Sequence, residues 1–413
     1  MDGAVKEYDI VIVGGGIAGP ALAAQLAPSG LSVLVLERQV AFRDRVRGEY
    51  MHPWGAAEVL RLGIEQTLLD AGGGYTTAMV GYDEDVDPSE AEEGAIPLGA
   101  FLPGVSGGMA VGHPQACEAL LALAAERGAV VRRGVADVVI TMGESPLIEY
   151  EVDGVHASTR CRVVVGADGR HSTVRRALGI ELEQVTSDRV LGGLLVESEH
   201  WTDGQASIGT EGDLHYLVFP RPGGFVRLYM SCEAGERTSG PDRAEEMQRA
   251  FRLASLPGSD ALAAAERVGP CAFVTGSDAW TIGGPVAGGA VLIGDAAGWS
   301  DPIIGEGLSV ALRDARSVAD VLLASDDWTP TAFEPYVVER AERMRRLQVA
   351  GRLQTEIRAT FTPEGRARRA RFREELLTEP LTLAPVLALL TGPETAPAEA
   401  FDNANVERLL SVS

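Results

Sequence analysis

Residues 8–37, YDIVIVGGGIAGPALAAQLAPSGLSVLVLE, decide the fold of this chain. Tyr8 to Val13 is a short apolar run typical of a buried strand, and Pro20 to Ala27 has the composition of a helix. Ser32 to Leu36 is a second strand-like run. The stretch therefore predicts a βαβ unit, the building block of a doubly wound α/β domain.

The turn inside this unit has the spacing of a dinucleotide-binding fingerprint. Gly14, Gly16 and Gly19 follow the first strand directly and open the helix. Glycines at these positions permit a tight turn, close approach of a pyrophosphate and close packing of the helix on the strand. Glu37 ends the second strand, where a carboxylate can bind the ribose hydroxyls of an adenosine. The alternative is a glycine-rich turn that binds nothing.

The composition sets limits on what the protein does. The 413 residues are 46% hydrophobic, enough for a large α/β body or two to three domains. A net charge of −23 argues against nucleic acid as a partner. The four cysteines and six histidines have no metal-binding spacing, which predicts reduced thiols and no metal. The first strand begins without a signal peptide and no apolar stretch spans a bilayer, so we expect a cytoplasmic protein without stable membrane insertion.

A second glycine-rich loop lies near residue 300. Ala290 to Ile293 suits an inner strand, Gly294 and Asp295 turn the chain, and a helix is expected from Leu308 to Leu323. Asp295 can accept hydrogen bonds from sugar-like hydroxyls, and the free N–H groups of the helix start suit an anionic oxygen or ring nitrogen. Glu306, between Gly305 and Gly307, is either a catalytic group or a solvated surface residue.

A third loop follows the strand Val163 to Val165. Gly166-Ala167-Asp168-Gly169 forms a turn before a helix that contains Ser172 to Leu178. Asp168 either holds an arginine or the cofactor in place, or is a turn residue beside a glycine at positive φ.

Polar residues cluster after Glu37. Of the arginines in this segment, Arg45 or Arg47 is expected to face phosphate, because a guanidinium forks onto phosphate oxygens. Glu49 and His52 precede a helix from Pro53 to about Leu62, and they either line a site or only cap the helix and face water.

Two segments break the α/β pattern with strand-like pieces, residues 76–102 and 181–267. We expect them to form one inserted, mainly β substrate-binding sheet, with strands at Thr76 to Tyr82 and Ile96 to Leu102 in the first segment. The candidates for lining a substrate cavity are His215, Tyr216, Phe219, Tyr229 and Met230. Because side chains alternate between the two faces of a strand, only about half of these candidates can lie on one face.

The chain after residue 330 is expected to be helical. It includes an arginine-rich stretch from Arg340 to Arg373, whose side chains we expect to pair with carboxylates of the same chain. The domains are therefore expected to be a dinucleotide-binding domain over 1–75, 103–180 and 268–330, a substrate-binding sheet over 76–102 and 181–267, and a helical region over 331–413.

Together the three loops resemble the motifs of the group A FAD-dependent monooxygenases, the p-hydroxybenzoate-hydroxylase-like family. The resemblance covers most of residues 8–323 and implies a GR2-type Rossmann-like FAD-binding domain with an inserted substrate domain. By this resemblance Glu37 binds the adenosine ribose, Arg47 the pyrophosphate and Asp295 the ribityl chain. The FAD contacts that it implies are Gly14, Gly16, Ala18, Gly19, Glu37, Arg38, Arg47, His113, Val135, Asp168, Asp295, Pro302, Gly305, Gly307 and Leu308.

The resemblance implies a reaction in which NAD(P)H reduces FAD, O2 adds at the flavin C4a and one oxygen atom reaches an apolar or aromatic small molecule, by hydroxylation or epoxidation. A separate flavin reductase is an alternative source of electrons, and a monomer or homodimer is expected. Candidates for lining the flavin or substrate site are Glu49, His52, His215, Tyr216, Tyr229, Pro302 and Glu306. Two positions depart from the family pattern: His113 replaces a frequent arginine, and Gly298 replaces a frequent histidine.

Local similarity to geranylgeranyl reductases and flavin halogenases supplies competing hypotheses. Arg47-Gly48-Glu49 and Asp301-Pro302 before Gly305-Glu306-Gly307 carry this similarity. The reductase hypothesis is the runner-up, and a flavin-binding protein without turnover is a further alternative. The halogenase hypothesis is weaker, because Lys6, the only lysine, lies ahead of the first strand and the Trp-x-Trp-x-Ile-Pro signature is missing.

Overall fold

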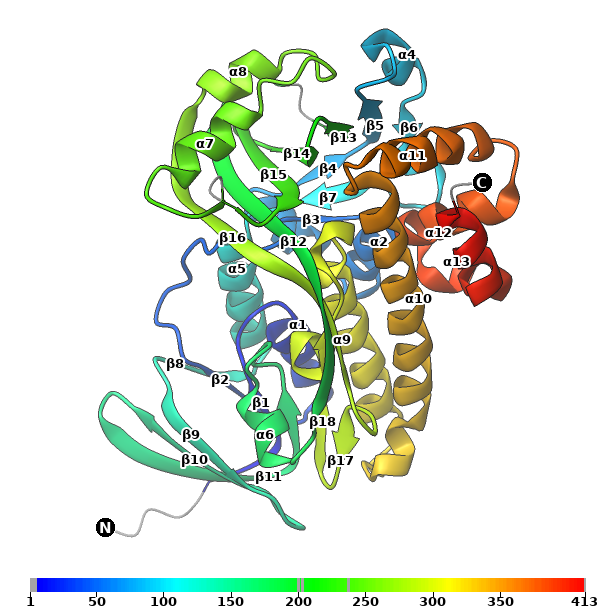
Figure 1. Cartoon of the computed structure of the whole chain (residues 1–413). Coiled ribbons are helices and arrows are strands. Elements are labelled where there is room, and N and C mark those ends of the chain that lie inside the picture. The colour runs from blue at the N-terminus through cyan, green and yellow to red at the C-terminus, as the bar shows by residue number, and fades with distance from the viewer. Residues whose placement is uncertain (1–5, 199–200, 202–203, 236–237, 412–413) are drawn as a thin grey trace.

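The computed structural model describes residues 6–198, 201, 204–235 and 238–411. Over these residues the chain forms two eight-stranded sheets and one three-stranded sheet, and the region after residue 330 is helical. The expected α/β fold with a helical C-terminal region is confirmed. In Figure 1 the long strands β12 (Leu182–Glu197) and β16 (Glu266–Thr281) run from the upper to the lower part of the molecule.

The first sheet carries the βαβ unit. Its order is β17-β18-β11-β1-β2-β8, with the β9–β10 hairpin attached to β11. Strand β1 lies parallel to β11 on one side and to β2 on the other, and β18 lies parallel to β11. The strands of this sheet are β1 (Lys6–Val13), β2 (Val33–Glu37), β8 (Val130–Arg133), β9 (Ala136–Thr141), β10 (Leu147–Val152), β11 (Val155–Gly166), β17 (Val286–Ala287) and β18 (Ala290–Leu292).

The second sheet has the order β19-β16-β12-β15-β14-β13-β5-β6. It pairs strands from both segments that were expected to form the inserted sheet, because β13 lies parallel to β5. Its remaining strands are β5 (Ala78–Asp83), β6 (Ile96–Pro97), β13 (Gln205–Glu211), β14 (Leu214–Arg221), β15 (Phe225–Glu233) and β19 (Gly298–Trp299). The small third sheet consists of β3 (Tyr50–Met51), β4 (Gly74–Thr76) and β7 (Gly108–Ala110).

Thirteen α-helices complete the described part of the chain. They are α1 (Ala18–Leu26), α2 (Pro53–Arg61), α3 (Glu65–Asp70), α4 (Pro88–Glu93), α5 (His113–Glu126), α6 (Thr173–Ala177), α7 (Arg243–Ala250), α8 (Ser259–Ala264), α9 (Gly307–Ala324), α10 (Glu334–Arg358), α11 (Pro363–Glu375), α12 (Pro380–Thr391) and α13 (Asn403–Leu410).

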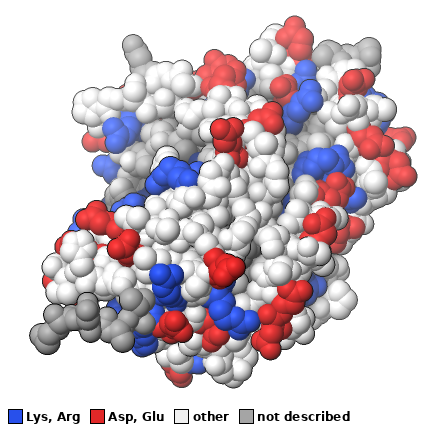
Figure 2. Space-filling model, turned by 90° about the horizontal axis from the view of Figure 1, so that it is seen from below, with Lys and Arg blue, Asp and Glu red and all other residues white. Residues whose placement is uncertain are grey.

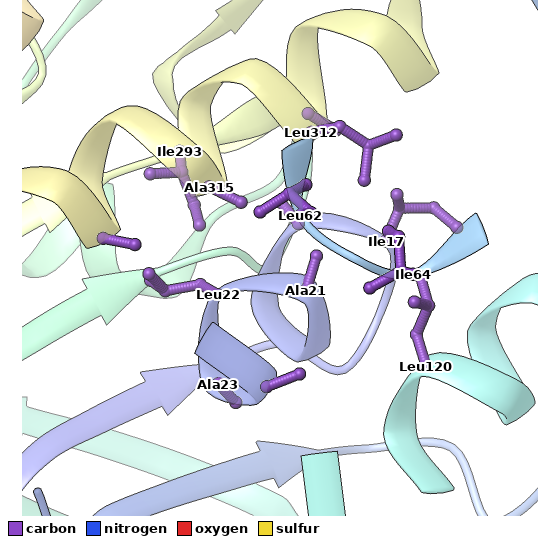
Figure 3. Packing of buried hydrophobic residues seen from close by; sticks show 14 of the residues in the cluster. Ile17, Ala21, Leu22, Ala23, Leu62, Ile64, Leu120, Ile293, Leu312 and Ala315 are labelled. Atoms are coloured by element: carbon purple, nitrogen blue, oxygen red, sulfur yellow. The ribbon is translucent and has the colours of Figure 1, made fainter. Parts of the chain in front are cut away.

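Alternation along β1 builds a core on each face of the first sheet. Ile10 and Ile12 pack against α1, α5 and α9, whereas Val11 and Val13 face the side covered by α6 and the β9–β10 hairpin. Figure 3 shows the first core from close by: Leu22 of α1 lies beneath α9, where Ala315 is labelled. These side chains are almost completely buried, so α1 is fixed rigidly behind the glycine turn.

Two expectations about the inserted sheet are wrong in detail. The strand expected from Ile96 to Leu102 ends at Pro97 and continues as a short 3-10 helix, Leu98–Ala100. Pro97 cannot donate to a strand ladder, which accounts for the early end. The boundary expected at residue 267 falls inside β16, which pairs with β12 along its length.

Charged side chains of both signs are interspersed on the face of the molecule that Figure 2 shows. Among the described residues, no helix is both long and apolar enough to cross a bilayer. Nor do the described residues bring three or more histidine, cysteine or acidic side chains into a group that could hold a metal ion.

Candidate active site

The three glycine-rich loops meet at one edge of the first sheet. Each follows the carboxyl end of a parallel strand, at Val13 of β1, Gly166 of β11 and Leu292 of β18. Backbone hydrogen bonds tie the loop ends together, since the Ala167 N–H donates to the Val13 carbonyl at 2.8 Å and the Ile293 N–H donates to the Gly166 carbonyl at 2.9 Å. Ligands of open α/β sheets bind at this edge.

Side chains of α9 and α10 hold the loop after β18 in place. Arg340 donates to the carboxylate of Asp314 at 2.9 Å and to the carbonyls of Ala297 and Gly298, each at 3.0 Å. Arg343 donates to the other oxygen of that carboxylate. The Gly294 N–H donates at 2.8 Å to the same oxygen as Arg340. All three charged side chains are buried, so this network fixes the loop that carries Asp295.

The loop after β11 is built around the start of α6. Asp168 accepts from the Thr173 N–H at 2.6 Å, and Ser172 accepts from the Arg175 N–H at 2.9 Å. The Arg175 guanidinium then donates to the Ala296 carbonyl at 2.9 Å, which joins the second loop to the third. The sequence left the role of Asp168 open; in the structure its Oδ2 accepts from the backbone at the start of α6, and its Oδ1 is buried without a hydrogen-bond partner among the described residues.

The glycines of the first loop have different roles. A Cβ on Gly14 would lie 2.3 Å from the Ala167 carbonyl oxygen, and φ at Gly14 is +114°. A Cβ on Gly19 would lie 2.1 Å from the Gly14 carbonyl oxygen. A Cβ on Gly16 would meet no heavy atom within 4 Å. Gly14 and Gly19 are therefore required by packing of the protein on itself, whereas Gly16 faces open space.

A cavity of about 280 Å³ opens between the three loops. Asp295 lies on its wall and pairs with Arg170 at 3.2 Å. Arg47 also borders it, with its charge close to Asp295. Of the fifteen expected FAD contacts, nine line this cavity: Gly16, Ala18, Arg47, His113, Asp295, Pro302, Gly305, Gly307 and Leu308.

The other six expected contacts do not line this cavity. Gly14, Gly19 and Asp168 are used in the turn and cap described above. Glu37 is buried, and its carboxylate accepts from the Gly15 N–H at 2.6 Å. The two residues that remain are Arg38, which is exposed, and Val135, which is buried and donates its N–H to the Glu37 carbonyl.

A larger cavity of about 370 Å³ adjoins the first, and its size is that of a small-molecule site. Its walls are mostly apolar and come from β14, β15, β16 and α12. The two cavities share the bordering residues Arg47, Gly48, Arg170, Pro302 and Gly305. A ligand in the smaller cavity would thus adjoin a molecule in the larger one.

Strand alternation decides which of the expected lining residues reach this larger cavity. His215, Phe219 and Tyr229 line it. Tyr216 and Met230 point to the other face, into a core with residues of α7 and α8, where the Tyr216 hydroxyl contacts Ser255 at 2.9 Å. The expectation that Tyr216 and Met230 line the site is therefore wrong, because successive side chains of a strand face opposite sides.

Glu49 borders the larger cavity as part of a buried ion-pair cluster. Its carboxylate accepts from Arg221 at 2.7 Å and from Arg227 at 2.9 Å and 3.0 Å. Arg227 is 0% exposed and also donates to Asp44 at 2.7 Å. Glu49 is 2% exposed and so does not face water, and its carboxylate also accepts from the His113 N–H at the start of α5, at 3.3 Å, rather than capping the helix that follows it.

Glu306 and His52 lie where the two cavities meet. Glu306 is 1% exposed, so it is not a solvated surface residue. Burial raises its pKa to about 8, and Trp54 and Ser309 lie beside it. His52 lines the larger cavity, and burial lowers its pKa to about 4. At neutral pH the pair is a protonated carboxyl next to a neutral imidazole.

Sequence reasoning did not single out Arg170, although it follows the third loop, Gly166 to Gly169, directly. Arg170 borders both cavities and stacks over Trp299 at 5.0 Å in addition to pairing with Asp295. Its position directly after Gly169, in a loop expected to lie beside the cofactor, could have identified it from the sequence. Gln354, Arg358 and Leu389, which line the larger cavity from α10 and α12, gave no such signal because they lie far from every motif.

Comparisons with known proteins agree with this arrangement. Residues 7–349 match the family described as FAD binding domain. The chain is 27% identical to the menaquinone reductase of Mycolicibacterium smegmatis, over 82% of this chain and 83% of that protein. It is also 27% identical to a 3-amino-4-hydroxybenzoate 2-monooxygenase of Streptomyces platensis, over 94% of this chain and 96% of that protein. The structure of p-nitrophenol 4-monooxygenase from Pseudomonas putida superposes with a TM-score of 0.78 at 17% identity, and the superposition covers 98% of this chain and 99% of that one.

The fold and the loops thus define a flavoprotein whose cofactor is FAD. The chain belongs to the FAD binding domain family, and within it to the FAD-dependent monooxygenase group, whose members use NAD(P)H as reductant. The expected resemblance to that group is confirmed.

Proposed function

We propose that the protein transfers one oxygen atom of O2 to an apolar or aromatic small molecule, by hydroxylation or epoxidation, in specialised metabolism. The observation that carries this proposal is the pair of adjoining cavities. One is bordered by all three glycine-rich loops, and the other is apolar, sized for a small molecule, and shares Pro302 and Gly305 with the first. This arrangement brings a substrate against a cofactor with little water between them.

The residues of the smaller cavity fit FAD. Gly16 leaves open space beside backbone N–H groups, which suits a pyrophosphate, and Asp295 presents carboxylate oxygens to a hydroxylated chain. When bound, FAD would supply the transfer of two electrons from NAD(P)H to O2, so that one oxygen atom enters the substrate and the other leaves as water. The protein supplies binding, orientation and exclusion of water.

Helix α9 contributes electrostatically. It begins at Gly307, and its first N–H groups lie beside the smaller cavity, where they favour negative charge by about 0.3–1 kcal/mol. Glu306 precedes this helix, and a charged carboxylate there would compete with a bound anion. Because burial raises the pKa of Glu306 to about 8, the group is neutral at pH 7 and can hold a proton between the two cavities.

The test begins with mixing chemically reduced, FAD-loaded protein with oxygenated buffer in a stopped-flow spectrometer, in the presence of candidate apolar substrates. Product is then analysed after reaction under isotopically labelled O2. A transient near-ultraviolet absorbance and one labelled oxygen atom in the product are expected. Omitting and adding a flavin reductase shows whether the purified chain accepts electrons from NAD(P)H by itself.

The second candidate function is reduction of an isolated double bond. The 27% identity to a menaquinone reductase favours it, as does the Gly305-Glu306-Gly307 loop. If no label enters any product and anaerobic reduced protein saturates an alkene, the monooxygenase proposal is wrong and the reductase takes its place. Halogenation is the less favoured alternative, since Lys6 lies in β1 over the Tyr8 ring and lines neither cavity.

A further inference from the structure

The arginines of the stretch 340–373 are paired almost throughout, as the sequence predicted. Nine of its eleven arginines lie within ion-pair distance of a carboxylate of the chain: Arg340, Arg343, Arg345, Arg346, Arg366, Arg368, Arg369, Arg371 and Arg373. Within the described part of the chain, Arg352 and Arg358 have no such partner. Arg352 is exposed, whereas Arg358 is partly buried and lines the larger cavity.

The carboxylate whose charge acts on Arg358 is already bound by other arginines. Asp83 acts on the charge of Arg358, but it is bound by Arg369 at 2.8 Å and by Arg373 at 2.6 Å. Those two arginines repel Arg358 and, together with burial, lower its pKa. A guanidinium stays charged despite such a shift, so the cavity contains a cation without a counter-ion from the described residues.

Two polar residues that line the cavity with Arg358 carry no charge. Gln354 lies one helical turn earlier on the same face of α10 and also lines the cavity. His215 lines it as well, and its pKa is lowered to about 3 by burial and by Arg358, so the imidazole is neutral. The hydroxyl of Thr210 donates to the Arg358 carbonyl at 2.9 Å and contacts the His215 ring, which fixes the end of α10 against the sheet.

The position of Arg358 along α10 sets its distance from the loop that both cavities share. Ala350 packs in one cluster with Ile304, in the loop shared by both cavities. Arg358 lies eight residues further along the helix, or about 12 Å at a rise of about 1.5 Å per residue. A molecule of this length can bind Arg358 with one end and reach the flavin-side loop with the other.

We propose that Arg358, with Gln354 beside it, is an anion-binding subsite that binds the carboxylate of an otherwise apolar substrate and so directs its other end to the Pro302–Gly305 loop. This inference rests on the proposed function, because it names the substrate class of the same cavity. A carboxylate matches the planar fork of one guanidinium. A phosphate dianion would need further cations, and the cavity offers none beside Arg358 except Arg45, Arg47 and Arg170 at the flavin side. The rest of the wall, which is mostly apolar, selects the hydrocarbon part.

The test compares a matched pair of probes, biphenyl-4-carboxylate and biphenyl-4-carboxamide, which differ in charge but hardly in shape. Each is titrated into FAD-loaded protein, and the dissociation constant is obtained from the perturbation of flavin absorbance. The wild-type protein should bind the carboxylate more tightly. Arg358→Met, which keeps an apolar stem, should weaken carboxylate binding by about 10- to 100-fold and change carboxamide binding by no more than about twofold.

Arg352→Met is the matched control, since it removes an unpaired arginine from the same helix outside the cavity. It should leave both dissociation constants unchanged. Arg358→Lys should retain part of the preference, because it keeps the charge but loses the fork. Thermal melting of each variant checks that the fold is retained.

Several results would overturn the subsite. These are equal affinity of the wild-type protein for the two probes, binding of neither at millimolar concentration, or equal effects of Arg358→Met on both. The readout requires no turnover, so it separates the two proposals. Arginine-dependent carboxylate binding without incorporation of labelled oxygen would refute only the proposed function, and oxygen transfer to a carboxylate substrate that Arg358→Met leaves unchanged would refute only the subsite.

Discussion

The Nε2 of His52 lies 4.0 Å from Oε1 of Glu306, at the junction of the two cavities. His52 reaches this point from the start of α2 and Glu306 from the start of α9, so neighbours in space are more than two hundred residues apart in the chain. The Glu306 side chain is fully buried, so water cannot stabilise a charge on it, whereas the His52 side chain is 12% exposed. The protonation state of Glu306 is therefore set by burial, and this has measurable consequences.

Glu306→Gln should flatten the pH dependence of stability. The folded protein keeps the Glu306 proton up to pH about 8, whereas the unfolded chain releases it near 4.5. Stability therefore falls as pH rises from about 4.5 to 8, by at most about 1.4 kcal/mol per pH unit. Urea unfolding of both proteins from pH 5 to 9 measures this difference. Glu374→Gln, at an exposed position of α11, is the control, and parallel curves for the wild type and Glu306→Gln would contradict the raised pKa.

Gly16→Val and Gly14→Val should fail in different ways. A side chain at Gly14 collides with the Ala167 carbonyl at a positive φ, so that variant should misfold or lose several kcal/mol of stability. A side chain at Gly16 meets no protein atom, so that variant should fold but bind FAD at least about tenfold more weakly. Thermal melting of the apoprotein and FAD titration separate the two outcomes. Tight FAD binding by Gly16→Val would refute the placement of the pyrophosphate.

Asp295→Ala should weaken FAD binding by about tenfold while leaving the apoprotein stable. The carboxylate is one-third exposed and its pair with Arg170 is of the kind that contributes about 0–1 kcal/mol. Asp320→Ala removes a comparable exposed pair with Arg316 on α9 and serves as the control, with unchanged FAD affinity. Equal FAD affinities of Asp295→Ala and the control would remove Asp295 from the cofactor site.

Glu49→Gln should cost about 3–5 kcal/mol of unfolding free energy, because it leaves Arg227 buried without its main counter-charge. Asp44→Asn removes the outer partner of the same guanidinium and should cost less, since Asp44 is partly exposed. Urea unfolding with saturating FAD measures both. A loss below about 1 kcal/mol for Glu49→Gln would mean that the cluster is not structurally important.

The sequence by itself determined the nucleotide-binding half of the fold. Strand, glycine turn and helix are local patterns, and the spacing of Gly14, Gly16 and Gly19 is set by backbone geometry within one short segment. The same holds for the loops at Gly166 and Gly294, and it explains why the flavoprotein class was predicted correctly. The inserted strands were predicted less accurately: Thr76 to Tyr82 covers the end of β4 and most of β5, the strand expected from Ile96 ends at Pro97, and no strand was predicted over most of β16.

Only the tertiary structure decided what the individual side chains do. Glu49 and Arg227 are 178 positions apart, and no local pattern marks them as partners. The face of β14 on which Tyr216 lies depends on which side of the sheet α7 and α8 cover. Burial of Glu306 and the unpaired charge of Arg358 arise in the same way, because solvent access and counter-charges are supplied by segments distant in sequence. Local sequence fixes backbone geometry, whereas charge, burial and contact are properties of the assembled fold.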